Sequence, residues 1–144
     1  MTVLDNVIIA TFFAQANDQL SREMATLAVE RVGLGPRLNS LASSLTTVEL
    51  RLMELARALA PQPEILLLDE ILAGLGTNET EHVLKVIEAI RQSGVTVVII
   101  EHTMHAMVRL TDRMLVLNHG VVCAEGDPQM VTSNPLAFNS STSL

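Results

Sequence analysis

The sequence predicts an α/β fold: an N-terminal helical region, then a mostly parallel sheet with flanking helices, and a C-terminal β-hairpin. Two aliphatic runs, at residues 65–68 and 95–100, have the length and composition of buried strands, and a helix is expected between them at residues 78–92. Strands that alternate with helices in this way form βαβ units with parallel strands. Residues 1–60, in contrast, carry only helix signals.

Three helices are expected in this N-terminal region. Residues 3–16 are apolar and ambiguous in their period, whereas residues 21–32 follow a helical pattern that stops at the glycines and proline of residues 33–36. A third helix is expected over residues 46–60 and ends before Pro61. The side chains expected to face inward are Met24, Leu27, Ala28 and Val32 in the second helix, and Leu50, Met53, Ala56, Leu59 and Ala60 in the third.

Two short helices and two strands are expected in the C-terminal part of the chain. We expect a short helix at 104–110, strands at 113–117 and 121–124, and a last helix at 128–132. The two strands form a hairpin, because Asn118-His119-Gly120 is a turn-forming sequence. We divide the chain into a helical region at residues 1–60, a second part at 61–134, and a tail at 135–144 that is rich in Asn, Ser and Thr and is expected to be disordered.

Composition and charge exclude several classes of protein. The chain has 144 residues, of which 49% are hydrophobic, so it can form one domain with a real core. A net charge of −7 and the absence of Trp and Tyr argue against a nucleic-acid surface. The single cysteine, Cys123, excludes an internal disulfide, and Asp5 lies where a secretory signal would be basic. The apolar run at residues 7–14 is too short to span a bilayer, so we expect an intracellular soluble chain.

Polar side chains follow both predicted strands. Asp69 and Glu70 end the first, and Glu101 and His102 end the second. Open α/β sheets bind ligands at the carboxyl ends of their strands, where Asp69 is suited to hold Mg²⁺, Glu70 to polarise a water, and His102 to contact a transferring phosphate. For either strand alone a plainer interpretation is equally good: the acidic pair caps the following helix, and His102 begins the next. The two strands together favour a nucleotide-hydrolysing rim.

Five motifs in order carry a family resemblance. From residue 45 to residue 128 the chain resembles the C-terminal half of an ABC-transporter ATP-binding subunit of the branched-chain amino acid or amide uptake group. The matching segments are residues 56–60 and Pro63 (signature helix), 66–70 (Walker B), 73–76 (D-loop), 100–102 (switch histidine), and 115–120 with 124–128 (closing hairpin). Residues 1–7 resemble the segment that follows the Q-loop, so the resemblance covers residues 1–133.

The resemblance implies part of a P-loop NTPase fold and a set of roles. Asp69 would ligate Mg²⁺, Glu70 would orient or deprotonate the attacking water, and His102 would steady the γ-phosphate across a dimer interface. The residues that would contact the nucleotide are Thr46, Thr47, Gly74 and Gly76. ATP and Mg²⁺ are the implied cofactors. A second ATP-binding subunit and membrane permease subunits are the implied partners, at the cytoplasmic, inner face of the cell membrane.

Other family features are absent from this sequence. It contains no Gly-x-x-x-x-Gly-Lys-Ser/Thr loop, because the only lysine, Lys85, has no glycines nearby, and it has no Q-loop glutamine ahead of Met1. The amides and lysine that cradle the β- and γ-phosphates are therefore missing. We expect the isolated chain neither to bind ATP tightly nor to hydrolyse it.

The signature motif also departs from the family pattern. Residues 45–49 read Leu-Thr-Thr-Val-Glu where the family has Leu-Ser-Gly-Gly-Gln. Thr46 keeps a hydroxyl, whereas Thr47 and Val48 replace glycines whose backbones approach a phosphate. Thr46 and Glu49 have the spacing of a capping box, so capping alone, or capping with weakened nucleotide contact, are both open. Gly76 replaces a common D-loop Asp or Asn.

Three hypotheses follow for the function. The chain is a truncated or fragmentary ATP-binding subunit, a non-catalytic module that docks onto a permease or full-length ATPase, or one half of a split ATPase. The DNA immediately upstream discriminates between them, because it would carry the missing motifs in frame, in a separate reading frame, or not at all. Without the first half of the fold, the sheet should have an uncovered edge and uncovered apolar faces, so we expect marginal stability or self-association.

Overall fold

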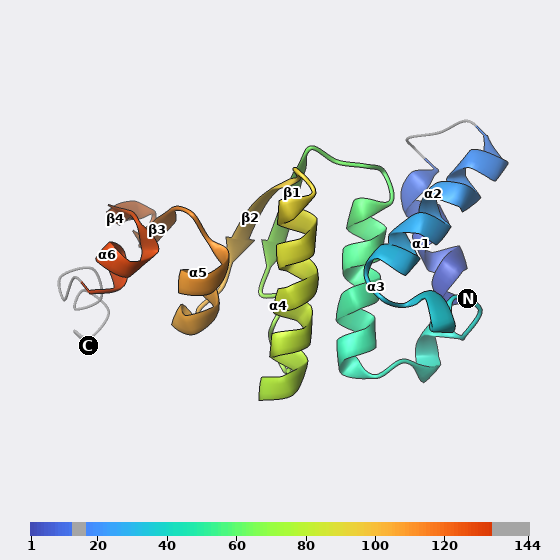
Figure 1. Cartoon of the computed structure of the whole chain (residues 1–144), viewed down its shortest axis with the longest axis horizontal. Helices are drawn as coiled ribbons and strands as arrows, with labels where there is room; N and C mark the ends of the chain where they lie inside the picture. The colour runs from blue at the N-terminus through green and yellow to red at the C-terminus, as the bar shows by residue number, and fades with distance from the viewer. Residues whose placement is uncertain (13–16, 134–144) are drawn as a thin grey trace. The chain divides into compact units, whose positions relative to one another are not determined.

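The computed structural model describes residues 1–12 and 17–133, which belong to two compact units, Met1–Ile100 and Glu101–Leu144 (Figure 1). The predicted disordered tail and the end of the first predicted helix, at residues 13–16, lie outside the described residues. Each unit contains its own pair of strands, and the α/β character expected from the sequence is confirmed.

Three helices form the N-terminal part of the first unit. They are α1 (Val3–Thr11), α2 (Asp18–Arg31) and α3 (Thr47–Leu59), with short 3₁₀ turns at Gly35–Arg37 and Ala42–Ser44 between the last two. Helix α1 packs against both α2 and α3, as Figure 1 shows in blue and green. The buried contacts come from small and branched side chains, among them Val7, Ala25, Val29, Leu55 and Ala56.

Two side chains that were expected to face inward are exposed. The exposed fraction is 61% for Leu27 and 37% for Leu50. Helix α2 instead buries Ser21, Met24, Ala25, Ala28 and Val29. These positions recur at the i, i+3, i+4, i+7 and i+8 spacing of one helical face, and Leu27 lies beside that face. The predicted inward stripe is confirmed for Met24, Ala28 and Val32, and it is wrong for Leu27.

A βαβ unit completes the Met1–Ile100 part. Strand β1 (Ile65–Asp69) is parallel to β2 (Thr96–Ile100), and helix α4 (Thr77–Gln92) connects them (Figure 1). On β1, Leu66 and Leu68 are buried, and α4 buries Val83, Leu84, Ile87 and Ile90. The parallel pairing predicted from the two aliphatic runs is confirmed.

The other face of this sheet is open. Ile65 and Leu67 on β1 are 59% and 73% exposed, and Val98 and Ile100 on β2 are 47% and 62% exposed. Among the described residues, each of the two strands has only one neighbouring strand. An edge and one apolar face are therefore exposed, as expected, whereas the face that carries Leu66 and Leu68 is buried.

The second unit contains a hairpin and two short helices. Its elements are α5 (Met104–Leu110), β3 (Met114–Asn118), β4 (Val121–Gly126) and α6 (Pro128–Thr132). The hairpin turns through His119 and Gly120, both with positive φ, as a tight two-residue turn requires. Helix α6 packs against β4 and α5. The predicted hairpin is confirmed, with boundaries displaced by one or two residues, and it forms a sheet of its own among the described residues.

Candidate active site

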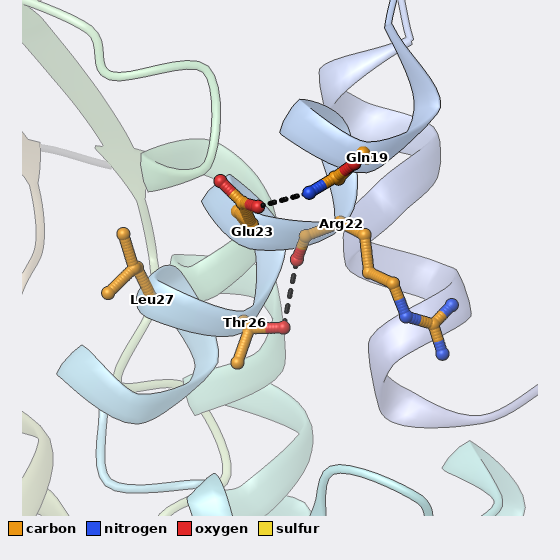
Figure 2. A pocket seen from close by; sticks show the side chains of 5 residues that line it. All are labelled: Gln19, Arg22, Glu23, Thr26 and Leu27. Carbon is orange, nitrogen blue, oxygen red and sulfur yellow. Dashed lines mark hydrogen bonds between the residues drawn. The ribbon is translucent and has the colours of Figure 1, made fainter.

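A surface hollow on α2 carries no evident chemistry. It has a volume of about 460 Å³ and is lined by side chains of successive turns of one helix (Figure 2). Gln19 donates a hydrogen bond to Glu23 at 3.1 Å, and the Thr26 hydroxyl donates to the carbonyl of Arg22 at 2.8 Å. These bonds are local to the helix, and the exposed Leu27 adds only an apolar wall. The candidate site therefore lies elsewhere, at the acidic end of β1.

The acidic end of β1 has an unusual backbone. Asp69 is exposed at the last position of the strand, paired with Ile100, and the Glu70 amide donates a hydrogen bond to the Ile100 carbonyl at 2.9 Å. Glu70 has a φ of 48°, in the left-handed region that residues other than glycine rarely occupy. Such conformations cluster at functional sites, because they persist only where the surrounding structure holds them.

The turn after Glu70 separates the acidic pair from the next helix. Gly74 turns the chain with a φ of 79°, and Gly76 is the N-cap of α4, where its amide donates to the Glu79 carboxylate at 2.9 Å. The plainer interpretation, in which Asp69 and Glu70 cap this helix, is therefore wrong. Capping of α4 therefore does not explain why Asp69 and Glu70 lie at the end of β1.

An arginine missed by the sequence analysis connects this turn to α3. The Arg51 Nη2 donates to the carbonyl of Ala73 at 3.4 Å, and its Nη1 contacts the Glu54 carboxylate at 2.9 Å. Ile71 and Leu72, each 6% exposed, anchor the same turn in the core. The turn that carries Gly74 is thus attached to the helix that begins at the degenerate signature motif.

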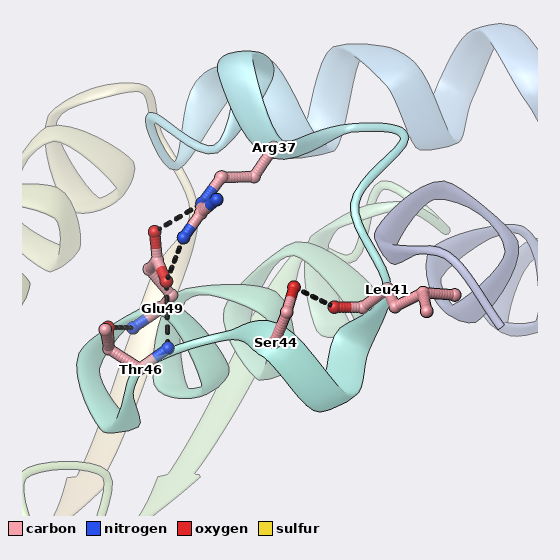
Figure 3. Close-up of polar contacts among 5 residues, drawn as sticks. All are labelled: Arg37, Leu41, Ser44, Thr46 and Glu49. Carbon is pink, nitrogen blue, oxygen red and sulfur yellow. Dashed lines mark hydrogen bonds and ion pairs between the residues drawn. The ribbon is translucent and has the colours of Figure 1, made fainter.

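The start of α3 is closed by its own side chains (Figure 3). The Glu49 amide donates to the Thr46 hydroxyl at 3.3 Å, and the Thr46 amide donates to the Glu49 carboxylate at 2.8 Å, which is the predicted capping box. Arg37 adds a two-pronged ion pair: its Nε lies 2.8 Å from Glu49 Oε1, and its Nη2 lies 3.3 Å from Oε2. Thr47 is the exposed first residue of the helix.

The electrostatics of Glu49 follow from these contacts. The hydrogen bonds from the Arg37 guanidinium, and next from the Thr46 amide, lower the pKa of Glu49 from 4.5 to about 2. The same pairing raises the pKa of Arg37. The negative charge that replaces the family's glutamine is therefore held against Arg37 and the helix cap. No local sequence pattern pairs the two residues, because Arg37 lies twelve positions earlier, at the end of a separate 3₁₀ turn.

The predicted site residues divide between the two units. Asp69, Glu70, Gly74 and Gly76 belong to one continuous segment of Met1–Ile100, to which α3 with Thr46 and Thr47 also belongs. His102 lies in the second unit, directly before Thr103, which is the N-cap of α5. Asp69 and Glu70 are thus described within one unit and His102 within the other, and the grouping of the three stays a prediction.

The described residues do not fit a complete Mg²⁺–triphosphate site. Within residues 1–12 and 17–133, no group of three or more His, Cys, Asp or Glu side chains is arranged to hold a metal ion. The single lysine, Lys85, lies on α4 with its Nζ 3.8 Å from the Glu81 carboxylate. Asp69 can supply one hard oxygen ligand, and Mg²⁺ in nucleotide sites takes its other ligands from waters and substrate phosphates.

No helix in the part of the chain that the structure describes has the length and apolarity to cross a membrane.

Solved structures with the same fold are ATP-binding cassettes. A nucleotide-free ATP-binding cassette from an ABC transporter superposes with a TM-score of 0.87 at 23% identity, covering 100% of this chain and 64% of that chain. The ADP conformation of MJ1267, an ATP-binding cassette of an ABC transporter, gives a TM-score of 0.86 at 23% identity, covering 100% of this chain and 63% of that chain. The fold is therefore part of the ABC ATPase cassette, which is a P-loop NTPase fold.

Sequence relatives give the family. No family model matches the chain. The high-affinity branched-chain amino acid transport ATP-binding protein LivG of Escherichia coli K12 is 34% identical over 152 residues, covering 94% of this chain and 59% of LivG. The ribose import ATP-binding protein RbsA of Streptococcus agalactiae is 33% identical over 140 residues, covering 94% of this chain and 28% of RbsA. The chain belongs to the ABC-transporter ATP-binding proteins, as its motifs predicted, and spans 59% of the length of LivG.

Proposed function

We propose that this chain supplies the water-activating part of the ATP-binding subunit of an ABC transporter for branched-chain amino acids or a related solute. The observation that carries the proposal is the acidic pair at the end of β1, with Glu70 held at a φ of 48° by the sheet. The solute class is supported by the match to LivG, at 34% identity over 152 residues, beside 33% over 140 residues for RbsA.

The proposed roles follow the chemistry of phosphoryl transfer, which depends on positioning and on charge neutralisation. Asp69 is the ligand for Mg²⁺, and Glu70 orients or deprotonates the attacking water. His102 steadies the γ-phosphate, and the nucleotide is approached by Gly74 and Gly76 of the turn. Thr46 and Thr47 approach it from the start of α3.

These roles require a larger assembly than this chain. The described residues offer neither a lysine-and-amide cradle for the phosphates nor a full set of metal ligands. We therefore propose that these residues act only within a complete ATP-binding cassette, which works with a second ATP-binding subunit and a membrane permease. Its place is the cytoplasmic face of the cell membrane, and ATP with Mg²⁺ is bound only in the completed assembly.

A second candidate is a non-catalytic module that docks onto a permease or a full-length ATPase. The observation that favours it is the closed start of α3, where Glu49 is engaged by Arg37 and by its own helix cap. An anion would have to compete with this carboxylate for the Thr46 amide. A split ATPase, completed by a separate chain, differs from this module because it recovers nucleotide binding when its other half is present.

Titration of Mg·ATP into the purified chain tests the proposal. We expect no saturable binding by the chain alone. With the part of E. coli LivG outside the match supplied as a separate polypeptide, we expect binding that Asp69→Asn weakens, together with turnover that Glu70→Gln removes. Glu64→Gln is the matched control, because Glu64 is an exposed carboxylate directly before the first residue of β1. If the chain captures a permease but binds no Mg·ATP, either alone or with the LivG polypeptide, the non-catalytic docking module is favoured instead.

A further inference from the structure

We propose that Arg51 is a positioning residue for Glu70: its guanidinium holds the turn between β1 and α4 against α3. The Arg51 Nη2 donates a hydrogen bond to the Ala73 carbonyl, 3.4 Å away and 22 positions along the chain. Ala73 belongs to the turn of residues 70–76, whereas Arg51 lies on α3. This inference rests on the proposed function, because it gives Arg51 a part in orienting the Glu70 carboxylate.

The turn of residues 70–76 needs support from neighbouring elements. Glu70 and Gly74 have positive φ values of 48° and 79°, and a residue such as Glu keeps this conformation only where the surrounding structure holds it. The Glu70 amide donates to the Ile100 carbonyl of β2 at 2.9 Å, which fixes the start of the turn. The contact from Arg51 is made in the middle of the turn, at Ala73.

A short hydrogen-bonded ring connects Ala73 to Glu70. The Ala73 amide donates to the Glu70 carbonyl at 3.1 Å, so Ala73 is bonded to Glu70 through its amide and to Arg51 through its carbonyl. That carbonyl belongs to the planar peptide group that precedes Gly74, so its direction is set together with the positive φ of Gly74. The hydrogen bond from Arg51 therefore restricts the turn at the point where a glycine allows the most freedom.

The guanidinium of Arg51 is itself held in one orientation. Its Nη1 lies 2.9 Å from a carboxylate oxygen of Glu54, three positions further along α3. Because the guanidinium is planar and its N–H groups form a fixed fork, an ion pair at Nη1 also orients Nη2. The helix that carries Arg51 is fixed in the core, since Leu52 and Leu55 are only 3% and 1% exposed. Arg51 is therefore a stiff connection between α3 and the turn.

Amide hydrogen exchange of the chain alone tests this connection without any nucleotide. Arg51→Met removes the donor and keeps an unbranched side chain, and it should speed exchange at the Ala73 amide at least tenfold. The Thr96 amide donates to the Glu64 carbonyl at 2.9 Å, at the other end of the β1–β2 pair, and should keep its exchange rate. Arg57→Met makes the same change at an exposed arginine of α3 and should leave both rates unchanged.

Two further variants keep the inference testable if Arg51→Met does not fold. Arg51→Lys keeps a charged donor for the same carbonyl and should raise the exchange rate at Ala73 less than threefold. Glu54→Ala removes the ion pair at Nη1 and should raise that rate at least threefold. Local and global opening are separated by comparing amides, so an equal rise at Ala73 and Thr96 would mean that Arg51 only stabilises the fold as a whole. That result, or unchanged exchange at Ala73 in Arg51→Met or Glu54→Ala, would overturn the proposal.

ATP turnover distinguishes the failure of this inference from the failure of the proposed function. In the assembly completed with the part of E. coli LivG outside the match, Arg51→Met should lower kcat at least tenfold and leave the KM for ATP within threefold. Binding should persist because Asp69 lies on the strand itself, ahead of the turn. An unchanged kcat would show that Arg51 does not position Glu70. An assembly without any ATP turnover would refute the proposed function, and the exchange rates at Ala73 would still decide whether Arg51 holds the turn.

Discussion

The start of α3 and the end of β1 use carboxylates in opposite ways. Glu49 is bound by the Arg37 guanidinium and the Thr46 amide, and its charge stabilises a helix terminus. At β1, two carboxylates lie next to each other in sequence, and Glu70 takes a left-handed backbone that disfavours folding. The Glu49 carboxylate thus stabilises a helix terminus, whereas for the pair at the end of β1 we propose a role in phosphoryl transfer.

The largest effect of a substitution, a loss of ATP turnover, is expected at the end of β1. In the assembly completed with the remaining part of LivG, Glu70→Gln should lower ATP turnover by about 10²–10⁴-fold, the usual contribution of a general base. ATP binding should persist, because the amide keeps the shape of the side chain. Steady-state turnover and equilibrium ATP binding are measured side by side, with Glu64→Gln as control. Equal losses of ATP turnover in Glu70→Gln and Glu64→Gln would mean that Glu70 has no role in the proposed hydrolysis.

The turn between β1 and α4 should be the most sensitive to backbone strain. Gly74→Ala should destabilise the chain by about 1–2 kcal/mol, because an L-residue pays that cost in the left-handed region. An added Cβ meets nothing within 4 Å there, so strain alone is measured. Gly76→Ala is the matched control, since Gly76 has an ordinary φ of −72°. Urea unfolding measures both, and equal free energies of unfolding would contradict the strain argument.

The cap of α3 should contribute somewhat less. Thr46→Ala removes the hydroxyl that accepts from the Glu49 amide and should cost about 1 kcal/mol, the typical value for a lost N-cap. Thr47→Ala, one residue later, should be close to neutral, because Thr47 is exposed and alanine favours helix. The two free energies of unfolding decide whether Thr46 serves the fold. Equal values for the two variants would mean that the capping box adds no stability.

Local patterns in the sequence predicted most of the fold. The bounds of β1, the capping box at Thr46 and the hairpin turn at His119 and Gly120 each depend on neighbouring residues, and each was recoverable. In the inward stripe predicted for α2, Met24, Ala28 and Val32 are buried, and only Leu27 is wrong, because it is apolar but lies beside the buried face. Hydrophobicity alone does not distinguish a core leucine from an exposed one at the next helical position.

The candidate site was only partly predictable from the sequence, because some of its contacts join residues that are far apart in the chain. The acidic pair stands out because two carboxylates directly end an aliphatic strand. The positive φ of Glu70 has no sequence signal, since glycine and asparagine are the residues that normally announce it. The Arg37–Glu49 pair and the Arg51–Ala73 contact join segments twelve and twenty-two residues apart, so they depend on tertiary structure.

The smallest expected effect is a pH dependence that belongs to α3 alone. The pKa of Glu49 is lowered in the folded chain from 4.5 to about 2, so the folded state favours the ionised form. The stabilisation is therefore fully present above about pH 4.5 and is lost as the pH falls toward 2. Arg37→Ala removes the main cause of the shift, and the unfolding midpoint should then fall less steeply across this window.

Glu49→Gln separates this carboxylate from the other acids of the chain. It cannot titrate, so the part of the pH dependence that Arg37→Ala removes should be absent in it too, while Glu54→Gln keeps the full dependence. Unfolding midpoints from pH 2 to pH 6 for the four proteins make the comparison. If the unchanged chain and Glu49→Gln lose stability in parallel, Glu49 does not hold the start of α3. The contrast with the acidic end of β1 would then fail.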